Sequence, residues 1–198
     1  MENPLVSICI PTHEMQDKKY FLARLMSSIK RQTYKNYEIV ITETGGMAEN
    51  TNNAIKRATG DLVKILYMDD YFAHENALKL IVEAFRGGWL VTGCNHDDRQ
   101  HKFNDHFASW NDELSTGKNT IGSPSVLTFE NKQPLLFDEN LTWLLDCELY
   151  DRLYKRYGLP TILDDINVTI GIGSHQMTNL IPNERKLLEF EYLNEKNN

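Results

Sequence analysis

Short apolar runs alternate with amphipathic stretches in the first half of the chain, and this alternation constrains the fold more than any other feature. The runs 5–10, 37–42 and 62–67 are rich in aliphatic and aromatic residues, as expected of strands covered on both faces. Between them, 20–31 and 52–58 have the spacing of helices. Helical crossovers connect parallel strands. We therefore expect an α/β fold whose mostly parallel sheet is flanked by helices on both faces.

The alternation continues and then weakens. A helix is expected over 75–85 and a strand over 89–92, whereas the polar, weakly periodic stretch 96–120 predicts a long loop over the sheet. Strands are also expected at 126–129 and 166–170, and helices within 138–156 and at 184–193. No Pro/Gly/Ser-rich linker divides the sequence. We therefore expect residues 1–198 to form a single domain.

Charge and cysteine content exclude several classes of protein. The 21 Lys and Arg residues against 28 Asp and Glu residues leave a net charge of −7, which argues against a nucleic-acid partner. No apolar run approaches the roughly 20 residues of an integral membrane segment, and the first residues do not resemble a signal peptide. Cys9, Cys94 and Cys147 are odd in number and far apart, which argues against a disulfide framework. These features predict a cytoplasmic protein.

Polar clusters directly follow the three apolar runs. They begin at Thr12, Glu43 and Asp69. Ligands of open α/β sheets bind beyond the carboxyl ends of the strands. We therefore expect a binding site where these clusters meet.

The adjacent carboxylates Asp69 and Asp70 give this site its sharpest chemical signal. Two such groups repel one another unless a cation or a donor lies between them, and Mg²⁺ and Mn²⁺ prefer oxygen ligands. A solvated turn, or the N-cap of the next helix, is the alternative explanation for an isolated Asp-Asp pair.

Motifs in sequence order suggest a family. The strand ending in Pro11-Thr12, then Gln32-Thr33-Tyr34, Ala58-Thr59-Gly60-Asp61 and Asp69-Asp70 resemble family-two glycosyltransferases. The resemblance is strong over roughly residues 4–72 and continues more weakly to about 178. It implies the GT-A fold, a Rossmann-like α/β architecture. In this fold a nucleotide-sugar-binding half, about 1–92, continues without a break into an acceptor-binding half, about 93–198.

The resemblance implies a donor and a cation. The donor is a nucleoside-diphosphate sugar, with a UDP-sugar favoured, and the cofactor is Mn²⁺ or Mg²⁺. The residues implied for nucleotide binding are Pro11, Thr12, Glu14, Glu43, Asn52, Met68 and Asp69. Those implied for the metal are Asp70, Asp69 and His175.

Three positions depart from the family pattern. Glu43-Thr44-Gly45-Gly46 stands where Asp-Asp-Gly-Ser is usual, and Glu43 can still accept a hydrogen bond from a base. Tyr67 occupies the position of the first acid of the Asp-X-Asp motif. Thr51-Asn52 replaces an Arg-Asn pair. These departures bear on which nucleotide is bound.

Asp146 matches the position of the family's catalytic base, which takes the proton of the acceptor hydroxyl in an inverting transfer. Leu145 replaces a preceding acid, and with Leu144 it could raise the pKa of Asp146 by desolvation. A helix-surface acid is the alternative interpretation. The acceptor is unknown. The residues expected to contact it or the sugar are Gly122, Ser123, Trp143 and His106, and the alternatives are a simple turn at 122–125 and a solvated loop around His106.

Two other functions remain open. A sugar nucleotidyltransferase should have a Gly-rich basic loop after the first strand, where this sequence has Pro11-Thr12-His13-Glu14. A non-catalytic module that binds nucleotide sugars is compatible with the altered motifs. The His- and Asp-rich stretch 94–106 lacks zinc-site spacings, and the Gly-X-Gly-X-X-Gly and P-loop patterns are absent.

Overall fold

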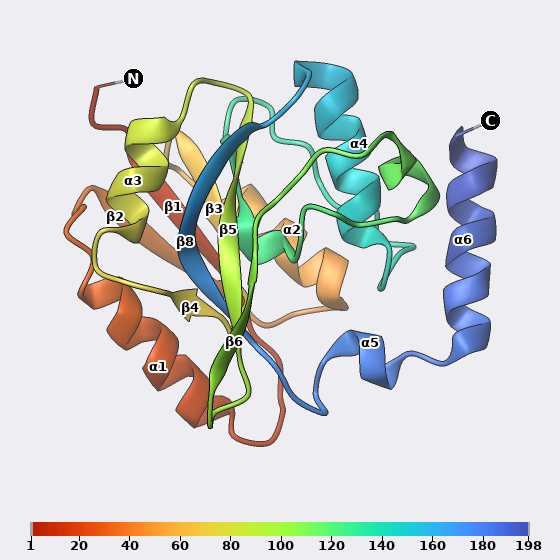
Figure 1. Cartoon of the computed structure of the whole chain (residues 1–198), viewed down its shortest axis with the longest axis horizontal. Coiled ribbons are helices and arrows are strands. Elements are labelled where there is room, and N and C mark those ends of the chain that lie inside the picture. Colours follow the sequence, from red (N-terminus) through yellow and green to blue (C-terminus); the bar gives the residue numbers. More distant parts are fainter. Residues whose placement is uncertain (1, 198) are drawn as a thin grey trace.

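The computed structural model describes residues 2–197, and its elements follow the expected alternation (Figure 1). The strands are β1 Val6–Pro11, β2 Tyr37–Thr42, β3 Leu62–Ile65, β4 Tyr71–Phe72, β5 Trp89–Asp97, β6 Lys102–His106, β7 Leu127–Glu130 and β8 Thr161–Gly171. The helices are α1 Lys18–Lys30, α2 Met47–Arg57, α3 Ala77–Ala84, α4 Leu145–Tyr157, α5 Met177–Leu180 and α6 Asn183–Asn197, with 3₁₀ turns η1 Asp112–Thr116 and η2 Pro124–Val126.

One sheet contains all eight strands of the described residues, in the order β2-β1-β3-β7-β5-β8-β4, with β6 paired to β5. Helices flank it, so the α/β fold class is confirmed. The expectation of mostly parallel pairing is only partly met. β1 is parallel to β2 and to β3, and β5 is parallel to β8, but the other four pairings in the described residues are antiparallel.

The reversed strand β7 explains this mixed sheet. It lies between β3 and β5 and runs against both of them. The chain leaves β5 at the edge where β1, β2 and β3 end, and it returns to β7 from that same edge. Gly122, Ser123 and the η2 turn, which come just before β7, therefore lie at the carboxyl edge of the parallel strands.

Apolar side chains between the sheet and the helices form the core. α1 buries Leu25 and Ile29 in this core. On α4, Tyr150 stacks on Trp89 of β5, with ring centroids 5.9 Å apart. Burial of such side chains contributes roughly 1.5–3 kcal/mol each. The core therefore fixes α1 and α4, two of the helices that border the carboxyl edge.

The stretch 96–120 is not one long loop, which corrects the expectation. β5 extends to Asp97 and forms a hairpin with β6, and η1 follows. Most β6 residues are exposed, so the hairpin is built by backbone pairing and no hydrophobic pattern marks it. α2 likewise begins at Met47 rather than near 52. The sequence pattern missed this start because the first turns of the helix bury polar residues, which do not show an apolar periodicity. No helix in the described part of the chain is long and apolar enough to span a bilayer.

Candidate active site

The carboxyl ends of β1 and β2 lie side by side, as the sequence predicts. Pro11 pairs with Thr42, and Thr12 donates to the carbonyl of Thr42 from both its backbone N–H (2.7 Å) and its hydroxyl (3.0 Å). Asn50 of α2 supports both ends, because its amide donates to the Thr12 carbonyl (2.8 Å) and accepts from the Thr44 N–H (3.2 Å). The expected nucleotide-binding loops are therefore built as one unit.

Lys18, at the start of α1, joins the two acids expected near the nucleotide. Its Nζ lies 2.6 Å from Glu14 Oε1 and also contacts Glu43 Oε1. Hydrogen bonding to Lys18 lowers the pKa of Glu14, and the same hydrogen bonds raise the pKa of Lys18. The side chain of Glu14 is 85% exposed and that of Glu43 is 50% exposed. Both carboxylates are open to a ligand, and Lys18 adds a cation beside them.

The two adjacent aspartates separate in the structure. Asp69 is 22% exposed in its side chain, and its Oδ2 lies 2.9 Å from His175 Nε2. Asp70 is only 2% exposed and accepts from the Gly171 N–H at 2.8 Å. Desolvation and then the charge of Asp69 hold the pKa of Asp70 well above its usual range. The carboxylate of Asp70 ties the end of β8 to the β3–β4 loop, and its expected role as a metal ligand stays a prediction.

The segment 67–70 is held in place by its neighbours. Met68 is buried. Arg24 of α1 donates to the Asp69 carbonyl at 2.5 Å and pairs with Asp97 of β5 at 3.0 Å. A Cβ on Gly171 would lie 2.4 Å from the Asp69 carbonyl oxygen, so β8 approaches this loop as closely as only glycine permits. Asp69 therefore projects from a rigid turn.

Asp69 and His175 have the donor chemistry for a divalent cation shared with a substrate. Mg²⁺ is usually bound through one or two carboxylates together with phosphate oxygens and waters, rather than by an all-protein cage. Within residues 2–197, no group of three or more His, Cys, Asp or Glu side chains could hold a metal ion by itself. A carboxylate beside an imidazole therefore fits a cation that a diphosphate helps to bind.

Asp146 lies in the first turn of α4 and is desolvated. Burial raises its pKa to about 6, although the Cys147 N–H (2.7 Å) and the Asn119 amide (2.7 Å) both donate to its carboxylate. The buried hydroxyl of Tyr67 is sensitive to the charges of both Asp146 and the Asp69–Asp70 loop. Its pKa is raised by burial and then by the charges of Asp146, Asp70 and Asp69. The carboxylate of Asp146 therefore shares one electrostatic environment with the Asp69 loop.

Three of the expected acceptor or sugar residues gather next to Asp146. Asn119 donates to the Gly122 carbonyl (3.0 Å) as well as to Asp146. His106 Nε2 lies 3.2 Å from the Ile121 carbonyl, which places the ring beside Gly122. Gly122 has a φ of +118°, a conformation that favours glycine, and Ser123 caps the η2 turn. The reversal of β7 thus places this segment next to the candidate base.

Two expected site residues are engaged elsewhere. Both amide hydrogens of Asn52 are used, one on the Phe137 carbonyl and one on Glu139, each at 2.9 Å. Both donors of the amide are thus occupied within the protein, and the expected contact of Asn52 with the nucleotide stays a prediction. The ring of Trp143 packs edge-to-face against Phe190 of α6, with centroids 5.3 Å apart, and Lys186 lies over it. α6 therefore covers part of this ring.

Sequence reasoning missed three residues that organise the site: Arg24, Asn50 and Asn119. Arg24 lies on an amphipathic helix, where an arginine is ordinarily a surface residue. Asn50 and Asn119 belong to polar stretches that have no periodicity. A signal was available only for Asn50, which is a buried polar residue in the first turns of α2. That signal can be recognised only when the start of the helix is known.

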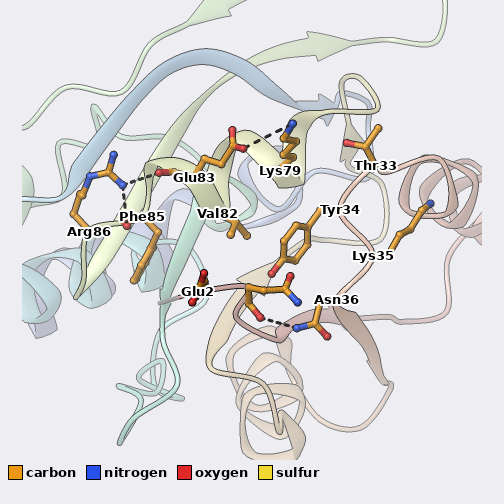
Figure 2. Close-up of a pocket in the computed structure, with 11 residues that line it drawn as sticks. Glu2, Thr33, Tyr34, Lys35, Asn36, Lys79, Val82, Glu83, Phe85 and Arg86 are labelled. Carbon is orange, nitrogen blue, oxygen red and sulfur yellow. Dashed lines mark hydrogen bonds and ion pairs between the residues drawn. The ribbon is translucent and has the colours of Figure 1, made fainter.

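One open cavity lies away from these residues (Figure 2). Its volume is about 930 Å³, and it is lined by residues that precede β1 and β2 and by the end of α3. These segments lie at the opposite edge of the parallel strands. Figure 2 shows Lys79 turned to Glu83, at 3.8 Å, and Arg86 bonded to backbone carbonyls. The cavity does not converge on a catalytic group.

Comparisons with known proteins give structural matches. No family model matches the sequence, and no curated protein matches it either. TarS of S. aureus (1–349) in complex with UDP-GlcNAc has a TM-score of 0.68 at 14% identity, covering 90% of this chain and 61% of that chain. The complex of the same TarS fragment with UDP has a TM-score of 0.65 at 16% identity, covering 85% and 61%.

A third match is the mannosyltransferase PcManGT from Pyrobaculum calidifontis in complex with GDP-Man and Mn²⁺. Its TM-score is 0.61 at 14% identity, covering 88% of this chain and 58% of that chain. This chain therefore spans 58–61% of the length of these three structures. The chain has the α/β fold of these glycosyltransferases, and the likeness is one of fold.

Proposed function

We propose that this chain is a glycosyltransferase of the GT-A type, similar to family two. It transfers a sugar from a nucleoside-diphosphate donor, with UDP favoured, to an acceptor hydroxyl with inversion. The observation that carries this proposal is the geometry at the carboxyl edge. The Asp69–His175 pair and the desolvated carboxylate of Asp146 lie at that edge, in a chain with the fold of proteins solved with UDP, UDP-GlcNAc and GDP-Man.

The donor binds on the half formed by about 1–92. Thr12 and the backbone beyond Pro11 line the nucleotide, while Glu43 accepts a hydrogen bond from the base. Lys18, beside Glu43 and Glu14, adds positive charge near the donor. Met68 forms part of the floor beneath it.

Asp69 and His175 would hold Mn²⁺ or Mg²⁺ together with the diphosphate. When bound, the cation would supply a positive charge that offsets the charge developing on the leaving diphosphate. Asp70 joins the Asp69 loop to the end of β8 by accepting a hydrogen bond from the Gly171 N–H.

Asp146 acts as general base on the half formed by about 93–198. The acceptor oxygen attacks the anomeric carbon, its proton passes to Asp146, and the bond from that carbon to the diphosphate oxygen breaks. A pKa of about 6 leaves Asp146 ionised at neutral pH and closer to the acceptor in basicity than an ordinary aspartate. Gly122, Ser123 and His106 line the acceptor or sugar beside it.

A non-catalytic module that binds nucleotide sugars is the second candidate, and the replacement of the first motif acid by Tyr67 favours it. A module of this kind would retain the donor contacts without needing a desolvated acid at position 146. Turnover of the donor separates the two functions.

The test has a binding arm and a turnover arm. Calorimetry with UDP and with GDP, each with and without Mn²⁺, measures nucleotide binding. Release of the nucleoside diphosphate is then followed for UDP-GlcNAc, UDP-glucose and GDP-Man, with water and a panel of simple glycosides as acceptors. Asp146→Asn is expected to reduce turnover by about 10²–10⁴-fold and to leave nucleotide affinity unchanged.

Asp164→Asn is the matched control, because Asp164 is an exposed acid on β8. It should behave like the parent. Nucleotide binding without any turnover would favour the binding module. Turnover that is equal in the parent and in Asp146→Asn would remove Asp146 as the base.

A further inference from the structure

A buried carboxylate of α6 binds the backbone just before Asp146. Glu189 is 2% exposed. Its Oε1 accepts from the Thr142 N–H at 3.0 Å, and its Oε2 accepts from the N–H groups of Trp143 (2.8 Å) and Leu144 (3.0 Å). One side chain thus satisfies three consecutive backbone donors.

The backbone N–H groups of residues 142–144 require an acceptor from outside the helix, and an anion is the acceptor that the helix dipole favours. They precede α4, which begins at Leu145, so the helix offers them no carbonyl partner. The helix dipole also favours a negative charge at this end. Arg185 of α6 pairs with Glu189 at 3.1 Å and fixes the orientation of the carboxylate. The segment 142–144 is therefore held by charge-assisted hydrogen bonds.

A second side chain of α6, Lys196, forms ion pairs with one acid that precedes Asp146 in the sequence and one that follows it. Lys196 Nζ lies 2.5 Å from Asp138 Oδ2 and 2.7 Å from Glu148 Oε1. Asp138 precedes the segment and Glu148 follows Asp146 in α4. Figure 1 shows α6 as a separate helix beside α4. Its contacts with the body thus include both flanks of the proposed base.

We propose that α6 positions the catalytic base, with Glu189 as a positioning residue that sets the place of Asp146 through the backbone of 142–144. The inference rests on the proposed function, since it takes Asp146 to be the base. Proton transfer requires a hydrogen-bonded approach of the carboxylate to the acceptor. A displacement of about 1 Å can reduce a rate by 10²-fold.

Glu189→Gln is the primary test because it preserves shape while removing charge. A glutamine has one carbonyl oxygen for three N–H donors, and its NH₂ group faces donors where the second carboxylate oxygen stood. We expect kcat for donor turnover to fall by about 10–100-fold. The Kd for UDP with Mn²⁺ should stay within about twofold, because the donor residues lie on other elements. Hydrogen exchange of amides 142–144 should accelerate.

Glu191→Gln, an exposed acid on the same helix, is the matched control and should behave like the parent. Lys196→Gln provides a second variant should Glu189→Gln fail to fold, because the Lys196 side chain is 37% exposed. It is expected to lower kcat by about fivefold at unchanged UDP affinity.

The outcomes separate the two proposals. If Asp146→Asn loses turnover while Glu189→Gln and Lys196→Gln keep a kcat within twofold of the parent, the positioning role of α6 is overturned and the proposed function stands. If Asp146→Asn keeps the parent's kcat, the base assignment fails, and the positioning role fails with it. A kcat loss accompanied by an equal loss of UDP affinity would indicate general disruption and would also overturn the positioning role.

Discussion

Replacing Asp146 with asparagine should stabilise the fold at neutral pH while removing activity. Burial raises the pKa of Asp146 from an ordinary 3.8 to about 6. An acid whose pKa is raised in the folded state is penalised where it is ionised, so the penalty is absent below about pH 3.8 and complete above about pH 6. At pH 7 this difference corresponds to about 3 kcal/mol.

Hydrogen bonding offsets part of this gain. The two oxygens of Asp146 accept from Cys147 and from Asn119, and an asparagine can accept from only one of these donors through its single oxygen. Asn119 cannot compensate by turning its amide, because its own oxygen accepts the N–H groups of Ile121 and Gly122 at 2.9 Å. One lost hydrogen bond costs about 1 kcal/mol. The net stabilisation is therefore about 2 kcal/mol at pH 7.

Urea unfolding of the parent and of Asp146→Asn at pH 7 and pH 5 measures the effect. At pH 5 much of the parent's Asp146 is protonated, so the ionisation penalty falls to about 1.5 kcal/mol and the two proteins should nearly converge. The parent's turnover should also decline as the pH falls through 6. Equal stability of the two proteins at both pH values would show that Asp146 is solvated, and it would remove the physical basis for its role as a base.

Three further perturbations test the remaining assignments. Asp70→Ala should unfold with a free energy about 1–3 kcal/mol lower than Asp70→Asn, because both variants lack the buried charge but only the asparagine can still accept from the Gly171 N–H; equal urea midpoints of the two variants would contradict the structural role. Glu43→Ala should weaken uridine and UDP by the same factor, about tenfold, as measured by calorimetry, and an effect on UDP alone would move Glu43 from the base to the diphosphate. His175→Ala should reduce the Mn²⁺-dependent part of UDP affinity and leave binding of uridine unchanged, whereas equal losses for both ligands would refute a role at the cation.

The sequence was sufficient for the parallel core of the fold and for the edge of the sheet at which the polar clusters gather. Strands β1, β2 and β3 are apolar runs in the sequence, and their pairing follows from the helices between them. In the structure β1 and β3 are buried, whereas the edge strand β2 is mostly half-buried. The polar clusters beginning at Thr12, Glu43 and Asp69 then had to meet at one edge of the sheet. These strands and the helices between them are consecutive in the chain, so the hydrophobic pattern of the sequence is enough to predict them.

Other features depended on contacts between residues far apart in sequence. The reversal of β7 results from its pairing with β3 and β5, and no run of residues specifies that direction. The β5–β6 hairpin depends mainly on backbone pairing, with His96 stacked on Phe103, and its mostly exposed side chains carry no periodic signal.

The roles of the two adjacent aspartates show the division most clearly. The sequence by itself determined that two carboxylates follow β3 and that a further acid, Asp146, stands near the start of a later helix. Only the tertiary structure decided that Asp69 meets His175 while Asp70 is buried against Gly171, about a hundred residues further on. The physical reason is that burial and hydrogen bonding, which set the pKa and the chemistry of a carboxylate, come from neighbours in space.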